Sequence, residues 1–203
     1  DNNVVGWFQG RMEFGPRALG NRSILANPMS KDMQKQLNLK VKFRESFRPF
    51  APAILEEEVS SWFKLKNDSP YMLIVDEILD EIKFPIKKSD QNLFGIDKLN
   101  VIRSKIPAVT HVDYSARIQT VSERTNKKYY NLIKKFKDLS GCPILINTSF
   151  NIRSEPIVCD PNDAVRCFLG TDIDILVLEN FLILKKDQKN IKIKKYIDQF
   201  VLD

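Results

Sequence analysis

Short apolar runs alternate with stretches of helical periodicity along most of the chain. Runs typical of strands lie at 4–9, 47–54, 71–75, 106–112, 143–146, 173–178 and 181–184. Helical patterns or helix start signals lie at 30–39, 56–63, 126–140 and 160–169. Strands that alternate with helices favour a twisted, open, mixed or parallel β-sheet flanked by helices, so we predict an α/β fold.

Two of the predicted helices carry the clearest signals. In the segment 126–140 an apolar stripe lies on one helical face, and Gly141 is a fitting stop after it. The stripe consists of Tyr129, Leu132, Ile133, Phe136 and Leu139. Asp160 followed by Pro161 is the cap and first-turn proline of the second helix. We interpret the stripe as part of the core and not as a cofactor site.

Two segments depart from the alternation. Residues 80–105 are polar and without a clear period, and we expect an insertion there and not a domain linker. Residues 185–203 form a basic tail, of which 185–195 has the pattern of a solvated helix face. A chain of 203 residues that is 43% hydrophobic can bury one sizeable core, so we predict a single domain over residues 1–203.

Composition narrows the class of protein. No apolar run approaches the roughly 20 residues that cross a bilayer, and the first residues lack the basic start of a secretion signal. We therefore expect a soluble, cytoplasmic protein without a membrane partner, and the start without Met indicates a piece of a longer chain. Three cysteines and one histidine offer no disulfide framework or zinc spacing. We expect Cys142, Cys159 and Cys167 to be buried, reduced thiols.

The positive charge is local. Residues 11–48 hold nine Lys or Arg and three Asp or Glu, a balance of +6 that equals the net charge of the whole chain. A uniformly basic surface would indicate nonspecific attachment to nucleic acid, whereas a local excess favours a focused anion pocket. Nucleic acid is therefore an unlikely partner, and a small anionic ligand is favoured.

The first part of this excess is the run R-M-E-F-G-P-R-A-L-G-N-R-S, residues 11–23. Gly15 and Gly20 allow close backbone approach or positive φ, Pro16 stiffens the turn, and the Arg17 guanidinium matches phosphate or carboxylate oxygens. We predict an anion-binding loop here. The alternative interpretation is a solvated basic loop.

The second part is V-K-F-R-E-S-F-R-P-F-A-P, residues 41–52. On an extended strand Lys42, Arg44 and Arg48 would share one face, while the apolar residues, Phe47 among them, would pack on the other. We predict a strand with one anion-binding face. The alternative is an exposed basic edge strand that discourages aggregation.

Two further segments follow predicted strands, where open α/β sheets usually bind ligands. The first, residues 110–117, carries His111 and Arg117, of which Arg117 is the better anion ligand and His111 could equally be structural. In the second, residues 146–156, neutral donors and acceptors stand at a strand end and suit phosphate oxygens or a nucleotide. They are Asn147, Thr148, Ser149 and Asn151. The alternative there is a turn capped by its own side chains.

These motifs together closely resemble the C-terminal domain of the NodU/CmcH-type O-carbamoyltransferases. They are G-R-M-E-F-G-P-R-A-L-G-N-R-S, V-K-F-R-E-x-F-R-P-F-A-P, H-V-D, N-T-S-F-N and E-P-I-V, and the match runs from about Gly6 to Leu184. The resemblance implies a YrdC-like fold, a twisted α/β sheet. It also implies that the domain works with an N-terminal actin-like, metal-binding domain, which we expect to lie outside this sequence.

The resemblance also implies a reaction. ATP and carbamoyl phosphate would bind to this domain, and carbamate would attack the α-phosphate to give carbamoyl-adenylate and pyrophosphate. The carbamoyl group would then pass to an acceptor hydroxyl in the N-terminal domain. Mg²⁺ would arrive with ATP, iron would belong only to the N-terminal domain, and no metal site is expected here.

The family's ligands fall on residues that the charge pattern had largely selected. They are Arg17, Lys42, Arg48, Arg117, Asn147 and Ser149. Arg17, Lys42 and Arg48 are the candidate catalytic residues, because fixed cations stabilise the charge that moves to the leaving pyrophosphate. Arg44, His111, Thr148 and Asn151 complete the candidate binding set.

Two positions depart from the family pattern. Tyr114-Ser115 stand where the family has Gly-Thr after H-V-D, and Ser154 stands where it has glycine. Tyr114 adds bulk where the family leaves space, which would alter a ligand's position. These departures support a second hypothesis, an inactive docking domain that only completes a partner's site. A third is an RNA-binding YrdC-like module, which would bind RNA with strong salt dependence.

Overall fold

The computed structural model describes residues 2–188 and 196–200 and contains one eight-stranded sheet. Its order is β4-β5-β3-β6-β2-β1-β7-β8. The strands are β1 (Val5–Phe8), β2 (Arg22–Ala26), β3 (Ala51–Leu55), β4 (Ile74–Glu77), β5 (Ser115–Val121), β6 (Ile144–Ser149), β7 (Ile175–Leu178) and β8 (Phe181–Leu184). Only the β3–β5 and β1–β7 pairs are parallel. The predicted open, mixed α/β sheet is therefore confirmed.

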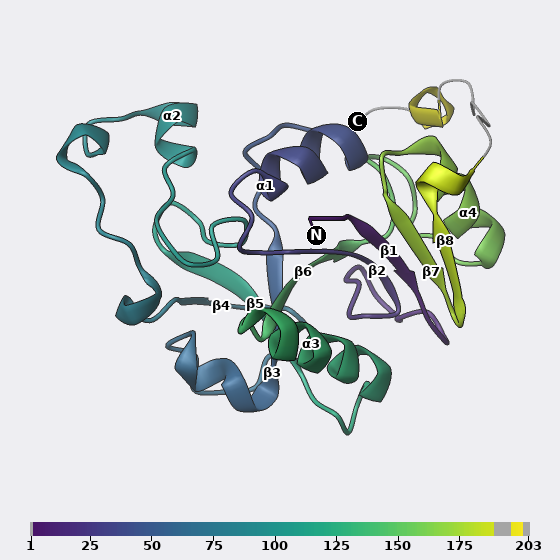
Figure 1. Ribbon diagram of the computed structural model, residues 1–203, viewed down its shortest axis with the longest axis horizontal. Helices are drawn as coiled ribbons and strands as arrows, with labels where there is room; N and C mark the ends of the chain where they lie inside the picture. Colours follow the sequence, from purple (N-terminus) through teal and green to yellow (C-terminus); the bar gives the residue numbers. More distant parts are fainter. Residues whose placement is uncertain (1, 189–195, 201–203) are drawn as a thin grey trace.

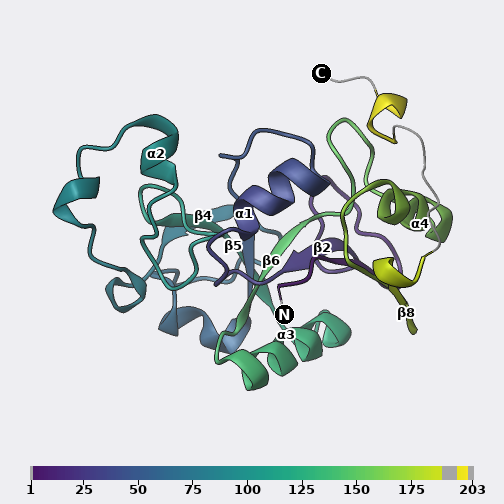
Figure 2. The same ribbon diagram turned by 45° about the horizontal axis from the view of Figure 1, so that its top comes forward.

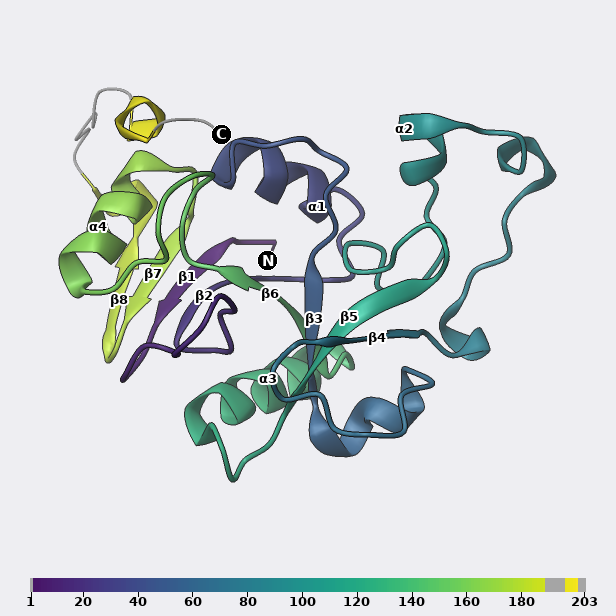
Figure 3. The ribbon, with the colours of Figure 1, turned by 180° about the vertical axis from the view of Figure 1, so that it is seen from behind.

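Helices cover both faces of this sheet (Figures 1 and 3). On one face α3 (Lys127–Ser140) packs on β3 and β6 through Tyr129 and Ile133. On the other face α1 (Met33–Gln36), its continuation η1 (Leu37–Val41) and α4 (Pro161–Gly170) share the larger core cluster. The 3₁₀ turn η2 (Glu56–Ser61) follows β3, where a short helix was predicted.

The two clearest helix predictions are confirmed with their caps. The Asn126 side chain accepts the Tyr129 N–H at 3.1 Å, and Gly141 ends α3 in the left-handed conformation at φ 77°. Asp160 and Asp163 form a reciprocal capping box at the start of α4. The predicted stripe is wrong only at Leu139, which is 78% exposed because α3 extends past the sheet at its last turn.

Two strands were missed and one was misplaced. Residues 22–26, assigned partly to a loop, form β2 in the middle of the sheet, and Arg117 lies inside β5 and not in a turn. The predicted strand 106–112 is wrong. Its segment turns because the Thr110 hydroxyl donates to Ile106 O at 2.9 Å and contacts the Ser104 hydroxyl at 2.7 Å, so local side-chain bonds replace a strand ladder.

The prediction of an extended strand from 41 to 52 is also wrong. Val41 ends the π-helical turn η1, residues 42–50 are irregular, and β3 begins only at Ala51. Buried Asn38 explains this path, since its amide donates to Ser46 O and Arg48 O at 3.1 and 2.9 Å. Phe47 is consequently half-exposed instead of packed in the core.

The remaining predictions concern the periphery. The segment 80–105 extends beyond the β4 edge with the short turns η3 (Asp80–Ile82) and η4 (Lys88–Asp90) and with α2 (Gly95–Leu99), as Figure 2 shows. In the tail, Lys185 begins the turn η5 (Lys185–Asp187). It is partly buried, since its ammonium donates to Phe168 O and Thr171 O at the end of α4, whereas Lys186 and Asp187 are exposed as predicted. Residues 189–195 of the predicted tail helix lie outside the described residues.

The cysteines follow the prediction with one exception. All three are free thiols, and Cys142 and Cys167 are buried, but Cys159 is exposed because it precedes the cap of α4 at the surface. Burial raises the pKa of the Cys142 thiol to about 12. No helix within residues 2–188 and 196–200 combines the length and apolarity that a membrane span requires.

Candidate functional site: a cationic cleft at the end of β6

Three adjoining cavities lie where the 11–21 loop, the irregular segment 42–50 and the end of β6 meet. An inner cavity of about 130 Å³ shares Arg44 and Ser149 with an outer cavity of about 400 Å³. The inner cavity also shares Arg117 and Phe50 with a side cavity of about 250 Å³. We call the three together the cationic cleft.

Every residue that the sequence selected as a ligand lines this cleft. Arg17, Arg117, Asn147, Thr148 and Ser149 line the inner cavity, while Lys42, Arg44, Arg48 and Asn151 line the outer one. His111 lines the side cavity. The structure thus brings the set together, although the argument from an extended strand at 41–52 was wrong. The convergence comes from η1 and the turn that follows it.

Arg17 and Arg117 lie close enough in the inner cavity for their charges to interact. Burial, and to a lesser degree the Arg17 charge, lower the pKa of Arg117. The Nε of each guanidinium is buried and has no hydrogen-bond partner among the described residues, and the same holds for Asn147 Oδ1. Unpaired buried polar atoms are costly, so these three groups are candidates for hydrogen bonds to a ligand.

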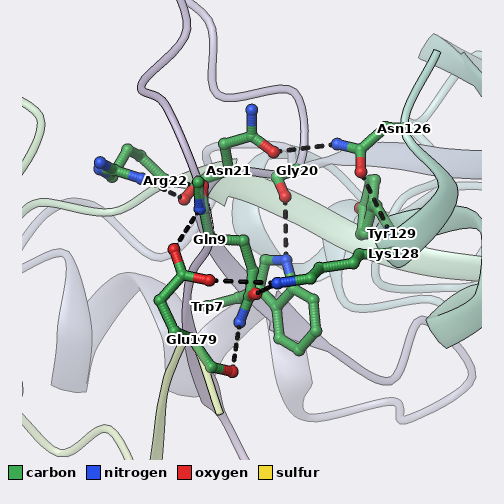
Figure 4. Close-up of polar contacts among 10 residues, drawn as sticks. Trp7, Gln9, Gly20, Asn21, Arg22, Asn126, Lys128, Tyr129 and Glu179 are labelled. Carbon is green, nitrogen blue, oxygen red and sulfur yellow. Dashed lines mark hydrogen bonds and ion pairs between the residues drawn. The ribbon is translucent and has the colours of Figure 1, made fainter.

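Contacts with Glu13, with α3 and with β1 hold the loop that carries Arg17. Glu13 Oε1 accepts the backbone N–H groups of Leu19 and Asn21 at 2.6 and 2.8 Å. Gly20 lies against the Tyr129 ring, where a Cβ would come within 2.2 Å of it, and Gly20 O accepts the Trp7 indole N–H at 2.9 Å (Figure 4). The loop position therefore depends on α3 and β1.

A second group of contacts holds the start of the same loop. Figure 4 shows Glu179 Oε2 and Gln9 Oε1 both accepting from the Lys128 ammonium at 3.1 Å. The other Glu179 carboxylate oxygen accepts the Gly10 N–H. These contacts connect the β7–β8 turn, α3 and the end of β1. Both ends of the 11–21 loop are thus anchored, while Arg17 between them is directed to the cleft.

Lys42 is almost fully buried, and its ammonium is saturated by protein oxygens. It donates to Ser149 O at 2.6 Å and to Asn151 O and Oδ1, both at 2.8 Å. Burial and the neighbouring Arg44 lower the pKa of Lys42 to about 7. In this arrangement Lys42 fixes the end of β6 to the turn after it.

Arg44 and Arg48 stand closer to the mouth of the outer cavity. Arg44 Nε donates to Asn38 Oδ1 at 2.7 Å and the guanidinium lies over the Phe50 ring, while burial and Arg48 lower its pKa to about 10. Arg48 is exposed and pairs with Glu45 at 3.0 Å. Screening weakens such an exposed pair, so Arg48 keeps the freedom to exchange its partner.

His111 lies in the side cavity and is partly exposed. Its Nδ1 is 3.3 Å from Asp113 Oδ1. The Asp113 carboxylate also accepts the Ser115 hydroxyl at 2.6 Å, and this bond lowers the pKa of Asp113. The pair holds the turn before β5, which leads to Arg117. His111 therefore contributes to the turn as well as to the cavity wall.

The two departures from the family pattern have a backbone explanation. Tyr114 and Ser154 both adopt the left-handed region, at φ 66° and 63°, where glycine carries no penalty. Tyr114 does not line the cleft. Its ring packs on the core with Lys83 above it, at 5.0 Å. The bulk of Tyr114 is thus directed away from the ligand space, contrary to the sequence-based expectation.

Sequence reasoning missed three residues that shape the cleft. Asn38 and Glu13 hold the two loops. Gln119 donates to Leu19 O and accepts the Asn147 amide at 2.6 Å. No sequence signal marked Gln119, since it lies in β5 among the polar residues Ser115, Arg117 and Thr120. Asn38 gave no signal either.

The electrostatic character of the cleft follows from its lining. Six cationic side chains line it, namely Arg17, Lys42, Arg44, Arg48, Arg117 and Arg153, and no carboxylate does so among the described residues. Glu45 contacts it from the rim, at 3.9 Å from Arg153. Across residues 2–188 and 196–200 no group of three or more potential metal ligands is formed by His, Cys, Asp and Glu. Fold and cleft thus define an α/β domain with a cation-lined cleft.

Comparison with known proteins identifies the family to which this domain belongs. Residues 1–185 match the family described as carbamoyltransferase C-terminus, and the chain belongs to it. An uncharacterized Synechocystis protein is 56% identical over 99% of this chain and 33% of its own length. Nodulation protein NolNO of Sinorhizobium fredii is 46% identical over 92% of this chain and 25% of its own, and NolO of Bradyrhizobium diazoefficiens is 44% identical over 90% and 30%.

Two consequences follow from these relatives. Family membership supports a transferase role, as the resemblance implied. The chain spans a third or less of the relatives that it matches. It therefore corresponds to a C-terminal domain of these longer proteins.

Proposed function

We propose that the cationic cleft binds ATP and carbamoyl phosphate and forms carbamoyl-adenylate. Water hydrolyses carbamoyl phosphate to carbamate and inorganic phosphate. A carbamate oxygen then attacks the α-phosphorus of ATP, a new carbamoyl oxygen–phosphorus bond forms, and the bond from the α-phosphorus to the bridging oxygen breaks as pyrophosphate leaves. An acceptor hydroxyl then takes the carbamoyl group in a further domain of the full-length protein. The observation that carries the proposal is the pair Arg17 and Arg117, whose buried Nε atoms have no partner among the described residues.

Electrostatics support an anionic ligand with several charges. Like charges in a confined cavity repel, and the carboxylate of Glu45 offsets them only at the rim, beside Arg48 and Arg153. A polyphosphate removes that repulsion and accepts the unpaired N–H groups. Adenylation moves negative charge to the leaving pyrophosphate, and fixed cations stabilise this shift without reorganising. Arg17 and Arg48 are the proposed cations for that step.

Neutral groups at the end of β6 complete the proposed site. Asn147 and Thr148 face the inner cavity, and the unpaired Asn147 Oδ1 can accept a hydrogen bond from a nucleotide base, ribose or carbamoyl amide. Ser149 and Asn151 are held by Lys42. We propose that Lys42 acts by keeping this strand end in place beneath the phosphates.

The residues present fit Mg²⁺ only as a companion of ATP. The cation prefers oxygen ligands, and no carboxylate lines the described cleft. Phosphate oxygens and water would supply its coordination. The iron that the resemblance implies would belong to the actin-like, N-terminal domain, which we propose as the partner within the full-length chain.

Calorimetry tests binding. The chain should bind ATP–Mg²⁺ and carbamoyl phosphate, and Arg117→Ala should weaken ATP binding about tenfold or more, the usual effect of losing a charge-assisted hydrogen bond. Arg124→Ala is the matched control, since Arg124 is exposed and lines none of the three cavities. A folded wild-type chain that binds neither ligand would instead support the inactive docking domain.

Isotope exchange tests the adenylate. Labelled pyrophosphate should enter ATP only when carbamoyl phosphate is present, because the reverse reaction needs carbamoyl-adenylate. The experiment uses the full-length protein, with and without carbamoyl phosphate. Formation of ADP without this exchange would mean that the bond to the γ-phosphoryl group breaks, by transfer or by hydrolysis, and would overturn the adenylate.

A further inference from the structure

Tyr196 comes from the C-terminal turn η6 (Tyr196–Gln199) and is buried beside α4, where Figure 1 shows η6 in yellow. Its ring lies against Gly170, the last residue of α4. A Cβ at Gly170 would lie 2.3 Å from Tyr196 Cγ, so no other residue type fits there without displacing the ring. The end of α4 is thus shaped to hold this tyrosine.

The Tyr196 hydroxyl donates to Oε1 of the buried carboxylate of Glu155. The second carboxylate oxygen accepts the Ile152 N–H at 2.8 Å. The backbone O of Glu155 accepts the Asn151 amide at 2.6 Å. A buried carboxylate is tolerated only when its oxygens are hydrogen-bonded, so Tyr196 supplies one of the bonds that keep Glu155 in place.

The turn 151–155 is the wall of the outer cavity, which Asn151 and Ile152 line. Asn151 Oδ1 accepts from the Lys42 ammonium at 2.8 Å and from the Ser149 hydroxyl at 2.7 Å. A continuous series of hydrogen bonds therefore runs from the C-terminal turn through Glu155 and Asn151 to the cleft. Tyr196 itself lines none of the three cavities.

We propose that Tyr196 is a positioning residue for the cationic cleft. By holding Glu155 it fixes the turn 151–155, and through Asn151 it fixes Lys42 and the end of β6 in the arrangement that binds the anionic ligand. The inference rests on the proposed function for its ligand. Tyr196 lies beyond residue 185, where the family match ends.

The decisive variant is Tyr196→Phe, which removes the hydroxyl and keeps the ring that fills the space at Gly170. Tyr130→Phe is the matched control, because Tyr130 also donates its hydroxyl to a carboxylate, that of Glu57, far from the cleft lining. Gly170→Ala is an independent variant that keeps the hydroxyl and displaces the ring. All three are made in the full 203-residue chain.

Two measurements are compared, amide hydrogen exchange at Ile152 and calorimetric affinity for ATP–Mg²⁺. Tyr196→Phe and Gly170→Ala should each speed exchange at Ile152 by about tenfold and weaken ATP binding by about three- to tenfold, whereas Tyr130→Phe should change neither. A lower melting temperature with unchanged ATP affinity would mean a purely structural role and would overturn the proposal.

The exchange measurement separates this inference from the proposed function. If the wild-type chain binds no ATP, the proposed function fails, and exchange at Ile152 still decides whether Tyr196 controls the turn. Unchanged exchange in Tyr196→Phe overturns the positioning role whatever the wild type binds.

Discussion

Arg22 and Arg17 belong to the same glycine-rich run, but one lies at the base of the loop and the other faces the cleft. At the base, Arg22 is buried and its guanidinium donates to Cys159 O, Gln9 O and Asn21 O at 3.0–3.2 Å. It also lies over the Phe8 ring, at 3.4 Å. In the cleft, Arg17 has a buried Nε without a partner among the described residues.

This difference separates structural cations from ligand-binding ones. A buried cation whose N–H groups are bonded to carbonyls stabilises the fold, and Figure 4 shows Arg22 beside Gln9 and Asn21, whose backbone oxygens accept from it. A cation with an unsatisfied group can be completed by a ligand. Lys42 is intermediate, since it is saturated like Arg22 yet lines the cleft beside Arg44.

The largest expected effect is on stability, from Arg22→Ala. Removing the guanidinium takes the donor from Cys159 O and Gln9 O and leaves a void beside Phe8, so the free energy of unfolding should fall by about 3 kcal/mol. The melting temperature should fall by roughly 6–12 °C. Thermal unfolding of Arg22→Ala beside the exposed control Arg124→Ala measures this. An unchanged melting temperature would remove the distinction between the two arginines.

The next effect is on binding, from Arg17→Ala. Loss of a charge-assisted, forked contact should weaken ATP binding by about 2 kcal/mol, or roughly thirtyfold. Stability should stay within about 0.5 kcal/mol, because the variant also removes an unpaired atom and the repulsion with Arg117. Calorimetry and urea unfolding on the same samples check both. Arg17→Lys, which keeps the charge and loses the fork, should be intermediate, and a destabilised variant with normal ATP binding would place Arg17 with Arg22.

A pH series tests whether the buried Lys42 side chain is charged or neutral in the folded chain. Below about pH 7 Lys42 is charged in both states and the cost of its burial is fully present. Between pH 7 and the ordinary pKa of 10.5 only the unfolded chain keeps the proton, so stability relative to Lys42→Met should rise with pH. The slope approaches about 1.4 kcal/mol per pH unit.

Urea unfolding of wild type and Lys42→Met at pH 6, 7.5 and 9 measures this difference. The comparison cancels the titration of other groups that both chains share. A constant difference across the series would mean that the oxygens of Ser149 and Asn151 keep the ammonium charged throughout.

The smallest effect is expected from Arg48→Ala. Arg48 and Glu45 are both largely exposed, so their ion pair contributes less than about 1 kcal/mol and stability should hardly change. ATP binding should weaken a few-fold at low salt, and the difference from wild type should shrink as salt is raised. Calorimetry at two salt concentrations checks this. A loss as large as that of Arg17→Ala, and insensitive to salt, would place Arg48 among the buried ligand-binding cations.

Local signals predicted those parts of the fold that are decided by neighbouring residues. The helices α3 and α4 were found with their caps, because Asn126, Gly141 and Asp160 act on backbone groups within one turn. The strand β2 was missed. Its residues are all buried between β1 and β6, so their pairing depends on partners distant in the sequence, which no local pattern contains.

The candidate site likewise has some features that neighbouring residues decide and others that depend on distant segments. Arg17 could be selected from its charge and its glycine-rich surroundings. Arg117 could be selected from its charge and its place after a predicted strand. The segment 41–52 was assigned the wrong conformation, because a single side chain, Asn38, fixes the path of residues 44–48 from another element. Cys159, expected inside, is exposed for a similar reason, since its backbone oxygen is held by the distant Arg22 just before the cap of α4.

The sequence by itself determined the α/β class, the main helices and the concentration of cations that marks the cleft, since periodicity, capping and charge are properties of neighbouring residues. Only the tertiary structure decided which cations are saturated. Arg22 meets carbonyls of Cys159, Gln9 and Asn21, Lys42 meets the end of β6, and Arg17 keeps an unpaired Nε among the described residues. Satisfaction of a charged group depends on atoms that folding brings from distant segments, and the order of residues does not contain that information.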